Sequence, residues 1–205
     1  MLELLNNLLH EKVLAIYGCG SKIYGLESGD SDEDYTVIVD ADFLPNVIKD
    51  NGIDYFVFGR KQFKEATDFK KGYLSFFLAW LDNTCLALDN LVYLDDGYKD
   101  EFLSIVNADW SLKFKIWLEI NINYFGARLL YSPEEKTLYN LYRLNSIVKN
   151  YKETGIFKSV FFENDKTLAL DFKSNPSTRI SHKNKLEEIF SYLERALKEE
   201  QQWVH

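Results

Sequence analysis

The sequence predicts an α+β protein in which a small mixed β-sheet backed by helices precedes a helical C-terminal half. Short hydrophobic segments alternate with helical segments up to about residue 59, as expected for a small sheet covered by helices. Beyond that point, apolar residues recur mainly at helical spacing. The chain has 205 residues, 46% of them hydrophobic, which suffices for a sizeable core. We therefore predict a sheet core over residues 1–95 and a helical region over 96–205 packed on it.

The first part of the chain carries clear local signals. Leucine at positions 2, 4, 5, 8 and 9 predicts an amphipathic helix over residues 2–11. Apolar runs, the second of them rich in β-branched residues, predict strands over 13–17, 35–39 and 54–58. Between the strands we expect two short helices, one over residues 21–26 and one that Pro45 opens and Asn51-Gly52 stops.

The rest of the chain is predicted to be mainly helical. Helices are expected over residues 60–68, 73–81, 100–106, 112–130 and 182–201, with a short strand within 86–94. Ser132-Pro133 predicts the start of a further helix, because Ser caps a helix and Pro suits its first turn. Gly155 predicts its end, just after Lys152. The segment 157–172 is ambiguous, and Asn175-Pro176-Ser177 indicates a turn.

The most informative segment spans residues 20–34, between the first two predicted strands. It begins with a Gly20-Ser21 turn into a short helix, whose free N–H groups favour phosphate. It ends with Asp32 and Asp34 where the next strand begins, and residues two apart in an extended chain point to the same side. Paired carboxylates suit Mg²⁺, which binds through a few carboxylates, waters and substrate phosphates. The alternative interpretation is a solvated acidic turn.

The order of these residues resembles the polymerase-β-like nucleotidyltransferase superfamily. The matching elements are Gly20-Ser21, Tyr24-Gly25 and Ser31-Asp32-x-Asp34 before a hydrophobic strand. The resemblance implies that the Gly20 backbone and Ser21 hold the β- and γ-phosphates of a nucleoside triphosphate. Lys22 would add positive charge there, unless the helix directs its side chain to solvent.

The same resemblance implies a set of three metal-binding carboxylates. Asp32 and Asp34 would bind two Mg²⁺ ions, for which Mn²⁺ can substitute. Asp54, at the start of the third predicted strand, matches the third acid of the superfamily by order and context. It would hold the ion that activates the acceptor hydroxyl.

Two further segments resemble the RNA-repair-associated predicted nucleotidyltransferases, also called the YcgL-like group. Arg60-Lys61-Gln62-Phe63 matches that family's Leu-Arg-Lys-Phe segment, and residues 136–144 are similar to its Lys-x-x-x-His-x-x-Arg helix. Lys136, Asn140 and Arg143 share a helix face, and the resemblance implies that they grip phosphate. Asn140 stands where the family usually has His, so it keeps a polar contact but cannot titrate. A solvated helix face is the alternative for these three residues.

The resemblance implies a template-independent transferase with a nucleoside triphosphate donor and an RNA acceptor, such as a tRNA end. Two alternatives remain open. One is the same chemistry on a protein side chain or a small hydroxylated molecule, and the other is a non-catalytic nucleotide-binding module. A net charge of −8 argues against broad, nonspecific nucleic-acid binding, although it allows a local basic groove.

Other residue types bear on the cellular context. Cys19 and Cys85 are too few for a disulfide framework, and no apolar run is long enough to cross a bilayer. The N-terminus carries no secretory signal pattern, so we expect a reduced, cytoplasmic protein without a membrane partner. His10, His182 and His205 lack metal-ligand spacing, and we expect local structural or surface roles for them.

Overall fold

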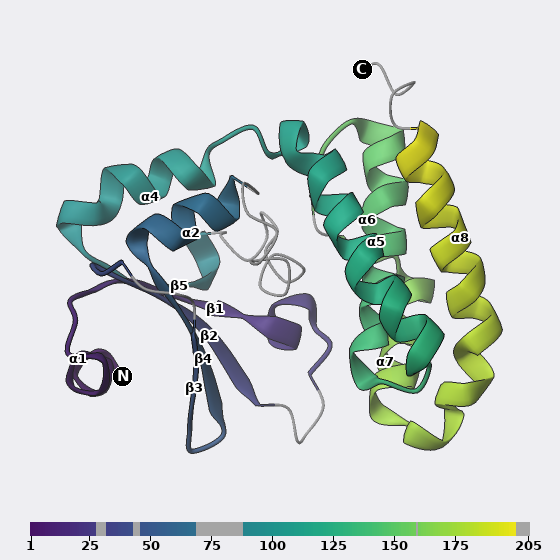
Figure 1. Cartoon of the computed structure of the whole chain (residues 1–205), viewed down its shortest axis with the longest axis horizontal. Coiled ribbons are helices and arrows are strands. Elements are labelled where there is room, and N and C mark those ends of the chain that lie inside the picture. Colours follow the sequence, from purple (N-terminus) through teal and green to yellow (C-terminus); the bar gives the residue numbers. More distant parts are fainter. Residues whose placement is uncertain (28–31, 43–45, 69–87, 159, 200–205) are drawn as a thin grey trace. The chain divides into compact units, whose positions relative to one another are not determined.

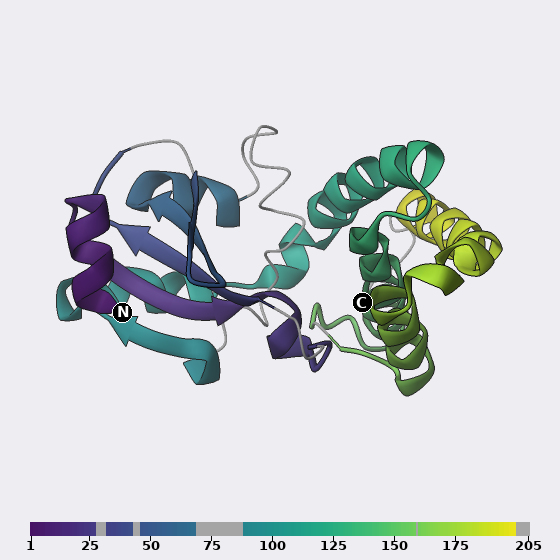
Figure 2. The ribbon, with the colours of Figure 1, turned by 90° about the horizontal axis from the view of Figure 1, so that it is seen from below.

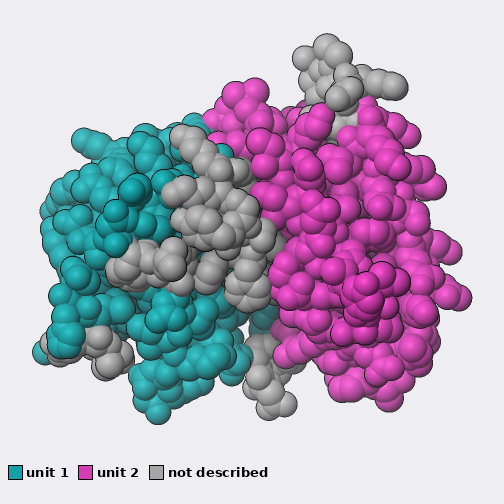
Figure 3. All heavy atoms as spheres, in the orientation of Figure 1, with its two compact units in different colours: residues 1–71, 80–108 teal, residues 72–79, 109–205 magenta. Residues whose placement is uncertain are grey.

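The computed structural model describes residues 1–27, 32–42, 46–68, 88–158 and 160–199, which fall into two compact units (Figures 1 and 3). The described residues up to 108 form the first unit, and those from 109 onward form the second. Helix α4 (Lys99–Val106) therefore belongs to the first unit, although we expected the division at residue 95. The predicted α+β class is confirmed, with the sheet in the first unit and a helical second unit.

The sheet of the first unit has five strands in the order β3-β4-β2-β1-β5, seen from two directions in Figures 1 and 2. The strands are β1 (Val13–Cys19), β2 (Glu33–Val39), β3 (Asn46–Asp50), β4 (Ile53–Gly59) and β5 (Leu91–Leu94). β2 and β4 are parallel, whereas β1 is antiparallel to both β2 and β5, and β3 is antiparallel to β4. The sheet is therefore mixed, and β3 lies at one edge of it.

Both faces of the sheet are covered by apolar side chains. One cluster joins Leu5 of α1 (Leu2–Leu9) to buried residues of β1, β2 and β4, including Val57. On the other face, Phe58 packs edge-on against Phe63 of α2 (Arg60–Thr67), with ring centroids 5.9 Å apart. Consecutive strand residues point to opposite faces, so Val57 and Phe58 belong to different layers. The sheet is thereby packed on both faces.

The segment after Pro45 corrects the sequence prediction, because it forms strand β3 rather than a helix. Asn51 and Gly52 both have positive φ, 48° and 79°, and they join β3 to β4 in a tight antiparallel hairpin. Asn-Gly is the preferred pair for a two-residue hairpin turn, which requires positive φ at both positions. Asn51-Gly52 therefore reverses an extended chain, whereas the sequence predicts that it stops a helix.

The other predicted elements of the first unit are present, and residues 21–26 lie largely in the 3-10 helix η1 (Gly20–Tyr24). The helix predicted over residues 73–81 and Cys85 lie outside the described residues. Two 3-10 turns flank β5, namely η3 (Leu88–Asn90) and η4 (Asp96–Tyr98).

The second unit consists of packed helices joined by short 3-10 segments. They are η5 (Trp110–Lys113), α5 (Phe114–Tyr131), η6 (Lys136–Tyr139), α6 (Asn140–Thr154), α7 (Glu163–Ser174), η7 (Pro176–His182) and α8 (Lys183–Glu199). Helix α8 packs against α5 and α6, and α6 also packs against α7. Stacked rings of Phe114 and Tyr151, with centroids 3.8 Å apart, tie α5 to α6.

Within the described ranges, no helix is both long and apolar enough to span a membrane.

Ser132 does not start a helix as predicted. Its N–H donates to the carbonyl oxygen of Arg128 at 2.7 Å, so Ser132 closes the end of α5. Its own carbonyl accepts from the N–H of Glu135, and the next helical residues begin at Lys136. The predicted end at Gly155 is confirmed, since Gly155 has φ 69° and closes α6. The ambiguous segment contains most of α7.

The hairpin turn yields a first prediction. Gly52→Ala should lower the free energy of unfolding by about 1 kcal/mol, because alanine at φ 79° is strained. No described atom lies within 4 Å of the added Cβ, so the loss would come from the backbone alone. Urea unfolding measures the effect. Gly52→Asn is the matched control, since Asn tolerates positive φ, and an equal loss in both variants would contradict this explanation.

Candidate functional site

The parallel pairing of β2 and β4 brings two of the predicted carboxylates together. Asp34 of β2 is the direct register partner of Asp54 of β4, and both residues are half-buried. Neighbouring strands lie about 4.8 Å apart, and paired residues in register point to the same face. The two carboxylates therefore lie side by side near the start of both strands, as the sequence motif predicts.

The Gly20-Ser21 turn lies against the same carboxylates. Cys19, the last residue of β1, is the register partner of Asp34, so the chain enters η1 directly beside it. Gly20 has φ 73°, and a Cβ at this position would overlap the carboxylate of Asp34. Ser21 is buried at the start of η1. Glycine is thus required here for two reasons, the backbone conformation and the close approach of Asp34.

Asp32 immediately precedes β2 and is exposed. Glu33, which lies between Asp32 and Asp34 in the sequence, has its own partners. The Lys22 ammonium lies 3.1 Å from a Glu33 carboxylate oxygen, and the Tyr35 hydroxyl donates to the other oxygen at 3.1 Å. These hydrogen bonds, from Lys22 first, lower the pKa of Glu33. Lys22 is thus engaged by Glu33, and its predicted role near the phosphates stays a prediction.

Lys49 is a member of this cluster that sequence reasoning missed. It lies on β3 opposite Asp54, and its Nζ is 2.5 Å from Oδ2 of Asp54. The hydrogen bond to Asp54 and the charge of Asp54 raise the pKa of Lys49, and the charges of Asp32 and Asp34 add to the increase. If Asn51-Gly52 is recognised in the sequence as a hairpin turn, the strand pairing that follows from it places residue 49 opposite residue 54. This signal would have identified Lys49.

These donors are chemically suited to a hard divalent cation. Carboxylate oxygens are the ligands that Mg²⁺ prefers, and the absence of a side chain at Gly20 lets the Asp34 carboxylate pack directly against the Gly20 backbone. Among the described residues, no three acidic, His or Cys side chains are grouped closely enough to hold a metal. The Lys49 ammonium contacts Oδ2 of Asp54, so a cation bound by Asp34 and Asp54 would compete with Lys49 for that oxygen.

The opposite ends of β2 and β4 carry a separate charged hollow of about 430 Å³. It contains Arg60 and Lys61 from the segment that resembles the Leu-Arg-Lys-Phe motif. Arg60 is paired with Glu101 at 2.5 Å, and Lys61 lies 3.5 Å from Asp42. Arg60 and Lys61 thus have carboxylate partners from the chain itself, and the hollow lies away from Asp34 and Asp54.

The other predicted nucleotide contacts belong to the second unit. Lys136 is exposed at the start of η6, whereas Asn140 and Arg143 are fully buried in α6. Nε of Arg143 donates to Oδ1 of Asn140 at 3.1 Å, and the Asn140 amide donates to the carbonyl oxygen of Thr137. The solvated-face alternative therefore fails for these two residues. A phosphate could reach them only after neighbouring side chains move, and their assignment stays a prediction.

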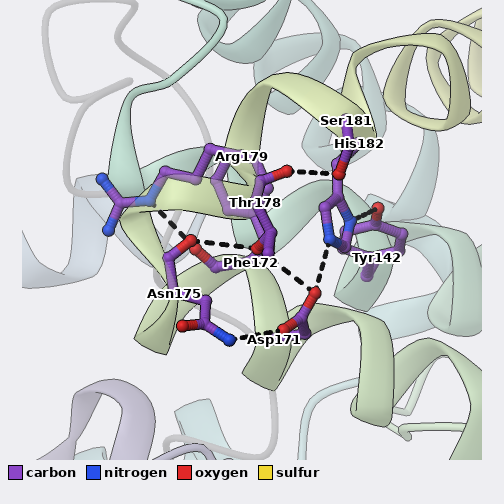
Figure 4. A network of polar contacts seen from close by, with 8 residues as sticks. All are labelled: Tyr142, Asp171, Phe172, Asn175, Thr178, Arg179, Ser181 and His182. Carbon is purple, nitrogen blue, oxygen red and sulfur yellow. Dashed lines mark hydrogen bonds and ion pairs between the residues drawn. The ribbon is translucent and has the colours of Figure 1, made fainter.

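A Tyr-His-Asp chain in the second unit joins buried Tyr142 and His182 to the partly exposed Asp171 (Figure 4). The His182 ring nitrogens lie 2.6 Å from the Tyr142 hydroxyl and 2.8 Å from Oδ2 of Asp171. Because a carboxylate only accepts, the His182 Nε2–H donates to Asp171 and Nδ1 accepts from Tyr142. Hydrogen bonds from Asn175 and then His182 lower the pKa of Asp171. The chain connects η7, α7 and α6, in agreement with the local role expected for His182.

Gly20→Ala should disturb the site. We expect a loss of about 1–2 kcal/mol in the free energy of unfolding from the positive φ, together with displacement of the Asp34 carboxylate. Urea unfolding and Mn²⁺ titration measure the two effects. Gly18→Ala on the same strand is the control, because its Cβ would meet only the carbonyl oxygen of Asn90 at 3.8 Å. Equal behaviour of the two variants would argue against the close packing of Gly20 on Asp34.

Tyr142→Phe tests the Tyr142–His182–Asp171 chain in the second unit. Removing the hydroxyl leaves Nδ1 of His182 buried without its donor, which should lower the free energy of unfolding by about 1–2 kcal/mol. Thermal or urea unfolding measures it. Tyr131→Phe is the control, since Tyr131 is 80% exposed and should tolerate the change. A neutral Tyr142→Phe variant would contradict a stabilising role for this hydrogen bond.

Comparison with known proteins does not add to this geometry. No protein-family model matches the chain, and a search of curated proteins gives no significant match.

Proposed function

We propose that this protein is a metal-dependent nucleotidyltransferase that moves a nucleoside monophosphate from a nucleoside triphosphate to an acceptor hydroxyl, with release of pyrophosphate. The observation that carries the proposal is the position of Asp34. It lies beside Asp54 in register and against Gly20 of the Gly-Ser turn. The residues proposed to bind phosphate and cations are thus adjacent in the sheet, which supports nucleotidyl transfer as the function.

Each of these residues has a role in the proposal. Asp32, Asp34 and Asp54 would hold Mg²⁺, with Mn²⁺ as a substitute, and the Gly20 backbone and Ser21 would hold the triphosphate. The bound cations would neutralise charge on the transferring phosphate and lower the pKa of the acceptor hydroxyl. The chain itself contributes position and charge, because phosphoryl transfer needs little covalent help from a protein. The strands on both sides fix the backbone of Asp34 and so support this role.

We propose RNA as the acceptor, with a tRNA end as the first candidate, in the cytoplasm. The resemblance of residues 60–63 and 136–144 to the RNA-repair-associated family supports this choice. Protein side chains and small hydroxylated molecules are the competing acceptors, and the experiment below separates them. Lys136, Asn140 and Arg143 remain proposed phosphate contacts.

The proposal is tested by incorporation of α-³²P-labelled ATP, CTP, GTP and UTP into tRNA, other RNA and protein, with Mg²⁺ or Mn²⁺. We expect label on RNA. Asp34→Asn and Asp54→Asn should each reduce the rate at least about 100-fold, because each removes a charge that the transition state requires. Label on protein would identify a protein acceptor instead. Pyrophosphate release during incubation with small hydroxylated compounds would indicate a small acceptor.

Asp40→Asn is the matched control for these variants. Asp40 directly follows the other end of β2 and is exposed, so its charge lies on the same strand but away from Asp34. This variant should retain the activity of the unmodified protein. Undiminished transfer by Asp34→Asn, or no nucleotide consumption with any acceptor, would overturn the proposed function.

A further inference from the structure

We propose that Lys49 binds a phosphate of the acceptor, on the side of the carboxylates opposite the Gly20-Ser21 turn, so that the site receives the hydroxyl end of an RNA chain. This inference rests on the proposed function, because it concerns the second substrate of the same site. It assigns to Lys49 a contact that the sequence motif does not contain, and it sets the direction from which the acceptor enters.

A single row of register partners crosses the sheet at the site, in the strand order that Figure 1 shows. Cys19 of β1 is paired with Asp34 of β2, and Asp34 is paired with Asp54 of β4. Asp54 is paired in turn with Lys49 of β3. Because the Gly20-Ser21 turn follows Cys19, this turn and Lys49 lie at opposite ends of the row, with the carboxylates between them. At about 4.8 Å per strand, three strand spacings amount to roughly 14 Å.

The geometry of nucleotidyl transfer assigns a different substrate to each end of this row. The attacking and leaving oxygens of a transferring phosphate lie roughly in line, on opposite sides of it. In the proposed function, the Gly20 backbone and Ser21 hold the β- and γ-phosphates, which leave as pyrophosphate. The acceptor hydroxyl must therefore approach from the other end of the row, where Asp54 and Lys49 lie.

Lys49 has hydrogen-bond donors to spare for a ligand at this end. Its Nζ lies 2.5 Å from Oδ2 of Asp54, and the Lys49 side chain is 71% exposed. An ammonium carries three N–H donors, of which the contact with Asp54 uses one. A phosphate oxygen can therefore bind the ammonium from the solvent side while the contact with Asp54 persists. Lysine binds phosphate well as a point charge.

The chemistry of an ammonium at this end separates the competing acceptors. In an RNA chain, a phosphodiester adjoins the terminal hydroxyls, so a cation beside the acceptor hydroxyl meets a negatively charged oxygen. Protein side chains and neutral hydroxylated molecules carry no phosphate next to the reacting hydroxyl. Lys49 thus favours RNA among the acceptors considered above.

Negative charge in the site sets the conditions of the test. The charges of Asp54, Asp32 and Asp34 all act on Lys49, and the same charges would repel an incoming phosphate. Divalent cations on these carboxylates would offset the repulsion. RNA binding is therefore measured at a saturating concentration of Mg²⁺.

The test is the binding of a fluorescein-labelled oligoribonucleotide to the full-length protein, measured by fluorescence anisotropy without nucleoside triphosphate. Lys49→Met should raise the Kd at least about fivefold and reduce the slope of log Kd against log salt by about 0.7, because one phosphate contact is lost. Lys49→Arg keeps the charge and should bind like the unmodified protein. In the transfer assay, Lys49→Met should raise the KM for RNA by a similar factor and leave the KM for the nucleoside triphosphate within about twofold.

Lys12→Met is the matched control. Lys12 is 60% exposed and its Nζ lies 2.8 Å from Asp95, so it resembles Lys49 in exposure and pairing. It directly precedes β1, at the other end of that strand from the Gly20-Ser21 turn. This variant should bind RNA and transfer label like the unmodified protein.

The outcomes separate the inference from the proposed function. Equal Kd values and salt slopes for Lys49→Met and Lys12→Met, with transfer of label to RNA by both, would overturn the role of Lys49 and leave the proposed function standing. Label on protein or on a small molecule, but not on RNA, would overturn the inference and leave the nucleotidyl transfer itself standing. Absence of nucleotide consumption by the unmodified protein would overturn both.

Discussion

The parallel pairing of β2 with β4 is the constraint on which the candidate site depends. It aligns Asp34 with Asp54, and the antiparallel neighbour β1 ends beside Asp34 and delivers Gly20 to it. A slip of one residue would turn Asp54 to the other face, because side chains alternate along a strand. Apolar clusters on both faces oppose such a slip, with Val57 in one cluster and Phe58 in the other.

The same pairing concentrates negative charge at the end of the sheet where β2 and β4 begin. Nearby lysines compensate this charge. Lys49 lies on Asp54, while Lys22 lies on Glu33. The two ion pairs differ in their relation to the predicted metal ligands. Lys22 binds an acid outside the predicted metal set, whereas Lys49 binds a member of it. The acidic residues and Lys49 are therefore parts of one hairpin-and-sheet arrangement, because the register of β3 places Lys49 at Asp54.

The second unit uses polar residues for packing. Arg143 and Asn140 bond to each other while fully buried, and His182 connects Tyr142 to Asp171. Buried polar groups need such partners, since an unsatisfied group would cost stability. The sequence allows two interpretations of the helix face with Asn140 and Arg143, namely ligand contact and a solvated helix face, and internal bonding of Asn140 and Arg143 is a third that the structure adds. In this structure internal bonding accounts for the contacts of Asn140 and Arg143 described above.

The sequence by itself determined the α+β class, most strands and helices, and the pairing of Asp34 with the Gly20-Ser21 turn. These follow from local patterns, namely alternation, helical spacing and a short motif whose parts are close in the chain. The tertiary structure alone decided the β3 hairpin, the position of Lys49 and the burial of Asn140 and Arg143. Asn51-Gly52 can end a helix or reverse a strand, and only the pairing of β3 with β4 selects between them. Burial likewise depends on which helices pack together, which spacing along one helix does not specify.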